Sequence, residues 1–161
     1  MREPLSWRRG KYQISTDTAR VDLSVVHGFL SSSYWAEGIP LEVVSRSLEH
    51  SLCFGLYEGD AQVGFARVVT DCATFAYLCD VFVVDSHRGG GLGKWLMETV
   101  IAHPNLQVLR RWLLATRDAH DLYRHLGFTD LTRPGIFMER HAPDVYKRRD
   151  TAVGESCKPA N

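Results

Sequence analysis

The sequence has no excess of either charge and no long apolar run. Its 161 residues include 19 Lys or Arg and 19 Asp or Glu, so the formal net charge at pH 7 is zero. Nonspecific binding to nucleic acid depends on many basic contacts to phosphates, which disfavours a nucleic-acid partner. No apolar stretch reaches the roughly 18 residues that indicate a membrane span. Residues 1–13 also lack the apolar segment of a signal peptide. We therefore expect no membrane partner.

Cysteine is also scarce. The four cysteines lie at positions 53, 72, 79 and 157, and none belongs to a C-x-x-C pair. Cys53 and Cys79 stand inside apolar runs, where a cysteine behaves as a small hydrophobic residue. His120 and His125 are five residues apart, a poor helical spacing for one metal ion. We therefore expect no metal, no disulfide framework and a reduced, cytoplasmic setting.

The composition is that of one folded domain. Hydrophobic residues make up 45% of the chain and charged residues 24%, close to the average of globular proteins. No internal repeat or linker interrupts residues 1–142, which we predict to form a single domain. Residues 143–161 are polar and carry the charge run Lys147-Arg148-Arg149-Asp150. We expect them to form a C-terminal extension.

Hydrophobic spacing predicts alternating strands and helices. Strands are predicted for residues 11–15, 51–57, 62–70, 74–84, 111–116 and 136–139. Helices are predicted for residues 22–33, with Asp22 as N-cap, and for residues 41–50, 92–103 and 119–126. The run at 74–84 is apolar almost throughout, which predicts a strand covered on both faces at the centre of the sheet.

A glycine-rich turn, Arg-Gly-Gly-Gly-Leu-Gly at residues 88–93, precedes the third predicted helix. Free amides at a helix N-terminus and the helix dipole favour an anion there, and glycines let a phosphate approach the backbone. A P-loop would need Gly at Arg88 and Ser or Thr at Trp95. The dinucleotide pattern G-x-G-x-x-G also fails, because its last glycine would fall on Lys94 or Leu96. The turn is therefore either a different class of phosphate site or a plain connection with a flexible glycine run.

Two motifs resemble those of the GCN5-related N-acetyltransferases (GNAT). Residues 88–93 follow the R/Q-x-x-G-x-G/A pattern of that family, between a strand and a helix. Residues 119–128 are similar to its A-x-x-L-Y-x-x-x-G-F signature. Together the motifs and their elements span about residues 51–139. The resemblance implies an α+β fold of three α/β/α layers, with an open, mixed, mostly antiparallel sheet of six to seven strands and about four helices.

The same resemblance implies acetyl-CoA as the acetyl donor. In this family the amides of the glycine turn hold the pyrophosphate, and the preceding strand pairs with the pantetheine arm through its backbone. The implied cofactor-binding residues are Val81, Phe82, Val83, Arg88, Gly89, Gly90, Gly91, Leu92, Gly93 and Thr116. Thr116 departs from the pattern, since many relatives carry Asn there.

Two residues are candidates for the chemistry. The resemblance places Tyr123 at the position of a general acid for the coenzyme A thiolate; the alternative is a tyrosine packed on the buried side of its helix. Asp80 is the only charge in the 74–84 run, and a buried carboxylate is costly unless it is paired or hydrogen-bonded. Asp80 is either a general base or substrate ligand for the amine, or a structural ion-pair partner of Arg67. A backbone amide near Val83 is the oxyanion donor that the resemblance implies.

Tyr34, Trp35 and Glu37 lie between the first two predicted helices, where the family forms its acceptor wall. Two aromatic rings and an acid can hold a cationic amine; packing on a helix face is the alternative. The predicted function is N-acetyl transfer from acetyl-CoA to a primary amine of a small molecule or peptide, by direct attack in a ternary complex. The alternative is a coenzyme A-binding sensor or interaction module without transferase activity. The oligomeric state stays open, a homodimer included.

Overall fold

The computed structural model describes residues 3–147. Its strands are β1 (Ser6–Arg9), β2 (Tyr12–Ser15), β3 (Leu52–Glu58), β4 (Ala61–Thr70), β5 (Phe75–Val83) and β6 (Arg111–Leu114). Its α-helices are α1 (Leu23–Ser31), α2 (Leu41–Glu49), α3 (Leu92–Ile101) and α4 (His120–His125). Of the predicted extension 143–161, all residues beyond 147 lie outside the described part. Within residues 3–147, no helix has both the length and the apolar character to cross a membrane.

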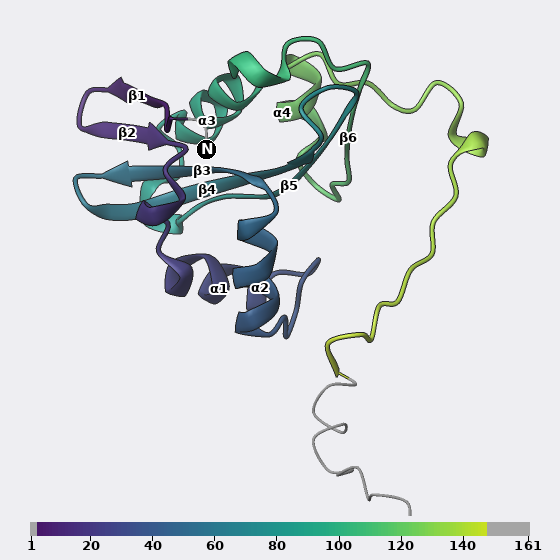
Figure 1. Ribbon diagram of the computed structural model, residues 1–161, viewed down its shortest axis with the longest axis horizontal. Helices are drawn as coiled ribbons and strands as arrows, with labels where there is room; N and C mark the ends of the chain where they lie inside the picture. Colours follow the sequence, from purple (N-terminus) through teal and green to yellow (C-terminus); the bar gives the residue numbers. More distant parts are fainter. Residues whose placement is uncertain (1–2, 148–161) are drawn as a thin grey trace, which may run out of the picture.

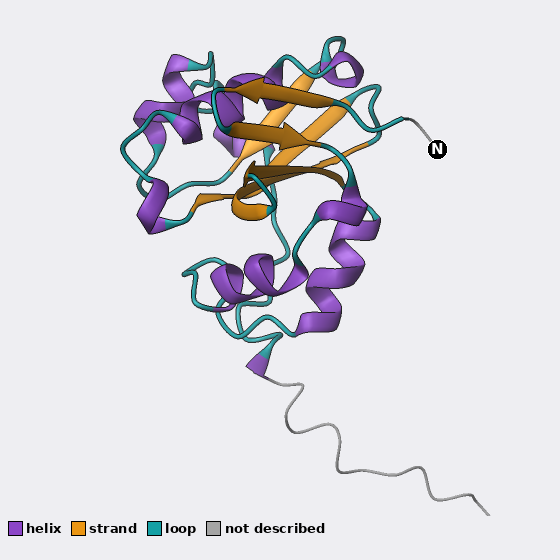
Figure 2. Cartoon of the chain, turned by 90° about the vertical axis from the view of Figure 1, so that its left-hand side faces the viewer, coloured by secondary structure: helices purple, strands orange, loops and turns teal. Residues whose placement is uncertain are grey.

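The strands form one open sheet in the order β1-β2-β3-β4-β5-β6 (Figure 1). All neighbouring strands are antiparallel except β5 and β6, which are parallel and joined through α3. Helices α3 and α4 cover one face of the sheet, and α1 and α2 cover the other (Figures 1 and 2). The predicted three-layer α+β fold with a mixed, mostly antiparallel sheet is confirmed.

Each face of the sheet has its own apolar core. On the α3 face, Leu96, Met97 and Val100 are fully buried with residues of β3, β4 and β5. On the α1 face, Val26 and Leu30 pack with a second set of buried residues: Val44, Cys53, Phe65 and Phe82. Full burial of one such side chain stabilises the fold by about 1.5–3 kcal/mol.

Helix α1 begins as predicted, with Asp22 as its N-cap. The Asp22 side chain accepts hydrogen bonds from the amides of Ser24 and Val25, at 2.9 and 3.2 Å. Such a cap stabilises a helix by about 1 kcal/mol. The Asp22 amide donates to Gln62 Oε1 at 2.7 Å, which ties the helix to β4.

The strands differ from the prediction in three ways. The strand predicted at residues 136–139 is wrong: a 3₁₀ turn spans Pro134–Ile136 and irregular chain follows, because no neighbouring strand pairs with this segment among the described residues. Strand β1 was not predicted, since its alternation is masked by polar residues. The sheet centre is also not β5, which neighbours the edge strand β6. Phe75 and Tyr77 are partly exposed, so the apolar run is not covered on both faces.

Candidate functional site

A bulge in β5 opens the sheet at Asp80. Phe82 pairs with Phe65 of β4 and Cys79 pairs with Arg67, so two residues of β5 stand opposite one of β4. Asp80 has a φ of 55°, in the left-handed region that few non-glycine residues adopt. The ladder between β5 and β6 ends one residue before Cys79. Within the described chain, residues 81–83 therefore have no strand partner on the β6 side.

A cleft of about 350 Å³ lies where the two strands part. It is lined by the end of β5, the glycine turn and α4. Its lining residues are Val81, Phe82, Val83, His87, Arg88, Gly89, Gly91, Leu92, Gly93, Ala119, Leu122 and Tyr123. The fold thus brings all the predicted cofactor residues together with Tyr123, except Gly90 and Thr116, which do not line this cleft.

The glycine turn presents free backbone amides to the cleft. Gly91 is the N-cap of α3 and has a φ of 73°, which glycine adopts without steric strain. Within the described residues, the amides of residues 89–93 donate to no backbone acceptor. A Cβ at Gly89 or Gly90 would meet no atom within 4 Å. The turn therefore leaves both donors and space for an anion.

Two arginines fix the conformation of this turn. Arg88 donates from Nε to the carbonyl of Val83 at 2.9 Å and pairs through Nη1 with Asp85 at 2.9 Å. Arg9 of β1 donates from Nη2 to the carbonyl of Gly90 at 3.0 Å, and its guanidinium lies 5.4 Å from the Trp95 ring centroid. The side chain of Arg88 is thus occupied within the turn. Arg9 was missed, because 81 residues separate it from Gly90.

His87 lines the cleft and was not singled out from the sequence. Its Nε2 lies 2.7 Å from Glu58 Oε2, and its Nδ1 lies 2.8 Å from Ser86 Oγ. Lys11 pairs with the other oxygen of Glu58 at 2.6 Å. Hydrogen bonds from Lys11 and His87 lower the pKa of Glu58. Glu58 therefore holds the His87 ring in a fixed orientation beside the turn.

Tyr123 separates the cleft from a larger cavity. The larger cavity, of about 820 Å³, lies between β6, α4 and residues 126–137, and Tyr123 lines both spaces. The side chain is 9% exposed. Burial raises the pKa of Tyr123 to about 12, and Tyr34 and Asp118 act in the same direction. The phenol is therefore protonated at neutral pH and can act only as a proton donor there.

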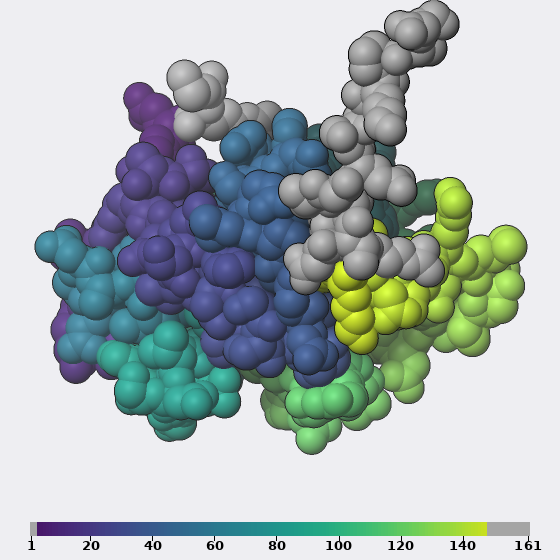
Figure 3. All heavy atoms as spheres, turned by 90° about the horizontal axis from the view of Figure 1, so that it is seen from below, coloured from purple at the N-terminus to yellow at the C-terminus, as the bar shows by residue number. Residues whose placement is uncertain are grey.

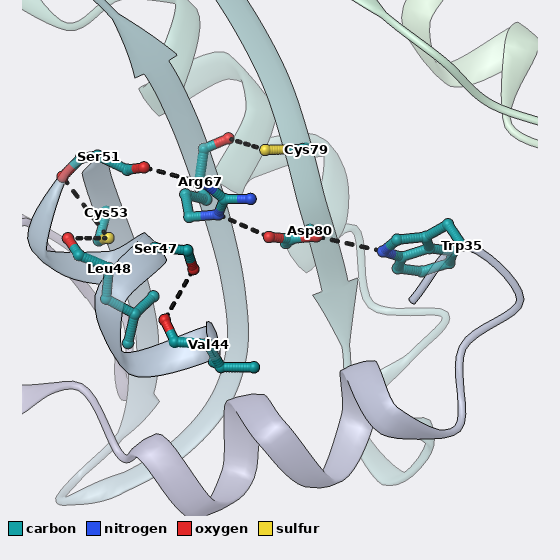
Figure 4. A network of polar contacts seen from close by, with 9 residues as sticks. All are labelled: Trp35, Val44, Ser47, Leu48, Ser51, Cys53, Arg67, Cys79 and Asp80. Carbon is teal, nitrogen blue, oxygen red and sulfur yellow. Dashed lines mark hydrogen bonds and ion pairs between the residues drawn. The ribbon is translucent and has the colours of Figure 1, made fainter. Parts of the chain in front are cut away.

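Asp80 is held by two partners (Figure 4). Arg67 Nε donates to its Oδ2 at 2.6 Å, and Trp35 Nε1 donates to its Oδ1 at 3.2 Å. Arg67 Nη1 also donates to Ser51 Oγ at 3.0 Å. Both carboxylate oxygens are engaged in this network, which favours the ion-pair alternative for Asp80.

The predicted acceptor residues lie in the loop between α1 and α2 and reach the same region. The Tyr34 hydroxyl accepts from the Arg117 amide at 3.1 Å, and the Arg117 guanidinium stacks over the Tyr34 ring at 3.9 Å. The Trp35 and Tyr34 rings meet edge-to-face. Glu37 is exposed in the same loop. The loop thereby contacts both β5, through Asp80, and the chain that enters α4.

Two further features complete the site. Thr116 lines the larger cavity, and its Oγ1 accepts from the Ala119 amide at 3.1 Å; its side chain therefore fixes the entry to α4. Phe29 of α1 was missed by the sequence reading. Its ring stacks on Phe82 with centroids 4.0 Å apart, so α1 packs directly against the strand that lines the cleft.

Comparison with known proteins gives consistent matches. Residues 49–130 match the acetyltransferase (GNAT) domain family. Putative acetyltransferase FG08082 of Gibberella zeae is 36% identical, over 80% of this chain and 85% of that protein. The crystal structure of a putative acetyltransferase of the GNAT family from Xanthomonas campestris pv. campestris is 51% identical, with a TM-score of 0.82 over 84% of this chain and 96% of that one. A predicted acetyltransferase from Clostridium acetobutylicum, crystallised with acetyl-CoA, shares the fold alone, at 13% identity and a TM-score of 0.57 over 81% and 94% of the two chains.

Proposed function

Because the chain belongs to the GNAT family of acetyltransferases, we propose that it transfers the acetyl group of acetyl-CoA to a primary amine of a small molecule or peptide. The amine attacks directly, with donor and acceptor bound together. The observation that carries the proposal is the cleft itself: the glycine turn, the unpaired end of β5 and Tyr123 line one continuous space.

The residues of the cleft fit a coenzyme A thioester. The free amides at the start of α3 suit the pyrophosphate, with the helix dipole behind them. The backbone of residues 81–83 faces the gap left by β6 and suits the amide groups of the pantetheine arm, in the manner of an added strand. When bound, acetyl-CoA supplies the acetyl group as a reactive thioester.

Tyr123 is proposed as the general acid. Formation of the amide bond releases the sulfur as a thiolate, which takes up one proton, and the amine loses one. The Tyr123 phenol lines the cleft and keeps its proton until pH approaches about 12. General acid catalysis of this kind contributes about 10²–10⁴-fold to a rate.

The sequence predicts Asp80 as a catalytic residue. Its contacts with Arg67 and Trp35 support a positioning role instead, and we propose that role. As general base it would have to take up a proton beside the Arg67 guanidinium, while Arg67 and Trp35 each donate to one of its oxygens. As a positioning residue it holds Trp35, and with it the Tyr34–Trp35 wall, against the bulge. Tyr34, Trp35 and Glu37 are proposed to receive the amine through ring faces and negative charge.

A binding measurement followed by a turnover assay tests the proposal. Acetyl-CoA at 100 times its Kd should add about 2.7 kcal/mol to the stability, seen as a rise in Tm of about 5–10 °C. Coenzyme A should give a similar rise, whereas ATP and NADPH should give none. Free thiol should then appear with acetyl-CoA and members of a primary-amine panel. Binding without turnover on any amine would favour the coenzyme A-binding module, and absence of binding would refute both.

A further inference from the structure

The loop between α1 and α2 bridges the gap where β5 and β6 part. The ladder between the two strands ends midway along β5. Beyond that point, Trp35 of the loop donates to Asp80 of β5 (Figure 4). Tyr34 of the same loop accepts from the Arg117 amide, in the segment that leads from β6 to α4. Figure 3 shows the dark blue atoms of the loop against the green atoms of that segment. In the proposed reaction, the acceptor therefore meets this loop as it approaches the thioester.

The side chain of Arg117 is held in place by stacking. Its guanidinium lies 3.9 Å from the centroid of the Tyr34 ring. That ring is itself fixed edge-to-face against Trp35, with centroids 4.9 Å apart. Stacking uses the face of the guanidinium, whereas its N–H donors lie in its plane and point outward. Among residues 3–147, the Arg117 guanidinium donates to no acceptor and pairs with no carboxylate. Arg117 is therefore oriented while its donors stay available to a ligand.

Three other arginines near the cleft use their donors within the fold. Arg9 and Arg88 donate to backbone carbonyls at the glycine turn and at the end of β5. Arg67 donates to a buried carboxylate of β5. These three side chains hold segments of the protein together. Arg117 differs from them, because its stacking contact fixes the guanidinium without engaging its donors.

The stacked pair of Tyr34 and Arg117 lies beside Tyr123, the proposed general acid. Burial is the largest cause of the raised pKa of Tyr123, and interactions with Tyr34 and Asp118 raise it further. Because such interactions weaken with distance, Tyr34 and Asp118 both lie near the phenol. Arg117 precedes Asp118 in the chain and stacks on Tyr34. An acceptor placed for the reaction at Tyr123 is therefore close to the Arg117 guanidinium.

We propose that the acceptor is a primary amine that also carries a carboxylate, as an amino acid does, and that Arg117 binds this carboxylate. The inference rests on the proposed acetyl transfer and names its substrate class. A guanidinium and a carboxylate pair through two parallel hydrogen bonds. The loop also carries the exposed carboxylate of Glu37, so the wall presents one group of each charge to the two charged ends of an amino acid. One guanidinium matches the single charge of a carboxylate, whereas a phosphate monoester carries more than one.

Matched pairs of acceptors test the substrate class. The panel contains glycine, β-alanine, γ-aminobutyrate and phenylalanine, each with its carboxamide, which keeps the amine and removes the negative charge. Release of free thiol from acetyl-CoA gives kcat/KM for each acceptor, calculated for the neutral form of the amine. At least one acid should exceed its amide by about tenfold or more, the effect of one hydrogen bond between charged groups. Equal values within every pair overturn the proposal, as does a higher value for O-phosphoethanolamine than for any of the acids.

Substitution of Arg117 assigns the preference to this residue. Arg117→Met should bring the ratio of acid to amide close to unity, and Arg117→Lys should keep part of the ratio, because lysine keeps the charge but lacks the planar fork. Arg110→Met is the matched control: Arg110 is also exposed, but it lies before β6 and not after it, so the ratio should be unchanged. All three substitutions are on the surface and should keep the Tm of the unmodified chain. An unchanged ratio in Arg117→Met overturns the assignment.

Calorimetry distinguishes failure of this inference from failure of the proposed function. In the full chain saturated with coenzyme A, the preferred acid should bind more tightly than its amide, and Arg117→Met should remove the difference. If no amine is acetylated but this difference in affinity is present, acetyl transfer is refuted and the carboxylate site stands. If amines are acetylated and acids and amides behave alike in both assays, the carboxylate site is refuted and acetyl transfer stands.

Discussion

The Arg67 Nε donates to Asp80 Oδ2 across β4 and β5 at 2.6 Å, and the two side chains are only 16% and 9% exposed. The other oxygen of Asp80 accepts from Trp35. Asp80 also takes the left-handed backbone conformation at the bulge. One residue thus shapes the strand that lines the cleft and connects it to the proposed acceptor wall.

Asp80→Asn should lower the free energy of unfolding by about 3 kcal/mol, since removing one partner of a buried ion pair leaves the other charge uncompensated. Asparagine is the conservative choice because it tolerates the left-handed conformation that Asp80 adopts. Urea denaturation measures the loss. Arg67→Met and the double variant complete a cycle, in which the double variant should recover part of the loss. If the stability losses of the two single variants add up to the loss of the double variant, the ion pair contributes nothing to the free energy of unfolding.

The same variant separates the two roles of Asp80. A positioning role predicts that Asp80→Asn raises KM for the amine and preserves the pH dependence of kcat. If Asp80 is instead the general base, kcat should fall by about 10²-fold or more and the acid limb of its pH dependence should disappear.

Tyr123→Phe should lower kcat by about 10²-fold or more and leave the Kd for coenzyme A within about twofold, because the ring that lines the cleft is retained. Steady-state kinetics and calorimetry measure the two quantities. Tyr77→Phe is the matched control, since Tyr77 lies on β5 but does not line the cleft. Unchanged kcat in Tyr123→Phe would remove this residue from the mechanism.

The pH dependence of stability gives a second test of Tyr123. An unfolded tyrosine ionises near pH 10, whereas burial raises the pKa of Tyr123 to about 12 in the folded chain. The unfolded state therefore binds fewer protons between these values, and stability present below pH 10 is lost as pH rises toward 12. Tyr123→Phe should lose less stability over this interval than the unmodified chain. Equal losses would mean that Tyr123 ionises alike in both states.

The features that the sequence predicted correctly are encoded over short distances. Asp22 caps α1 through amides two and three residues away, and the glycine turn follows from six consecutive residues. In the described part of the chain, the four α-helices and five of the six strands likewise arise from local hydrophobic spacing. The cleft residues could be grouped because the end of β5, the turn and the start of α3 are consecutive.

The features that were missed depend on contacts between distant segments. Arg9 reaches the turn from β1, and Tyr34 meets Arg117 although 83 residues separate them. The left-handed conformation of Asp80 arises from the mismatch between β4 and β5, which no local pattern reveals. The strand predicted at residues 136–139 failed for a related reason, since strand propensity does not state whether a partner is present.

Gly91→Ala should weaken coenzyme A binding and lower the free energy of unfolding by about 1–2 kcal/mol, because alanine is strained at a φ of 73°. A steric clash does not cause this loss of stability, since the nearest atom, Arg9 Nη2, would lie 3.6 Å from the new Cβ. Gly90→Ala is the matched control for stability: its Cβ meets no atom within 4 Å and its φ is not positive. Thermal denaturation with and without coenzyme A compares them. Equal stability of the two variants would contradict the conformational argument.

Arg9→Ala should raise the Kd for coenzyme A about tenfold, equivalent to the roughly 1.4 kcal/mol of one charge-assisted hydrogen bond, and leave kcat at saturating acetyl-CoA unchanged. The Gly90 carbonyl accepts from Arg9, and in a planar trans peptide the following amide points the opposite way. Arg9 therefore orients the Gly91 amide toward the anion before it binds. Arg8→Ala is the matched control, because Arg8 is an exposed neighbour in the same strand. Equal affinities in the two variants would show that the turn keeps its conformation without Arg9, and a large fall in the Tm of free Arg9→Ala would assign Arg9 to the stability of the fold.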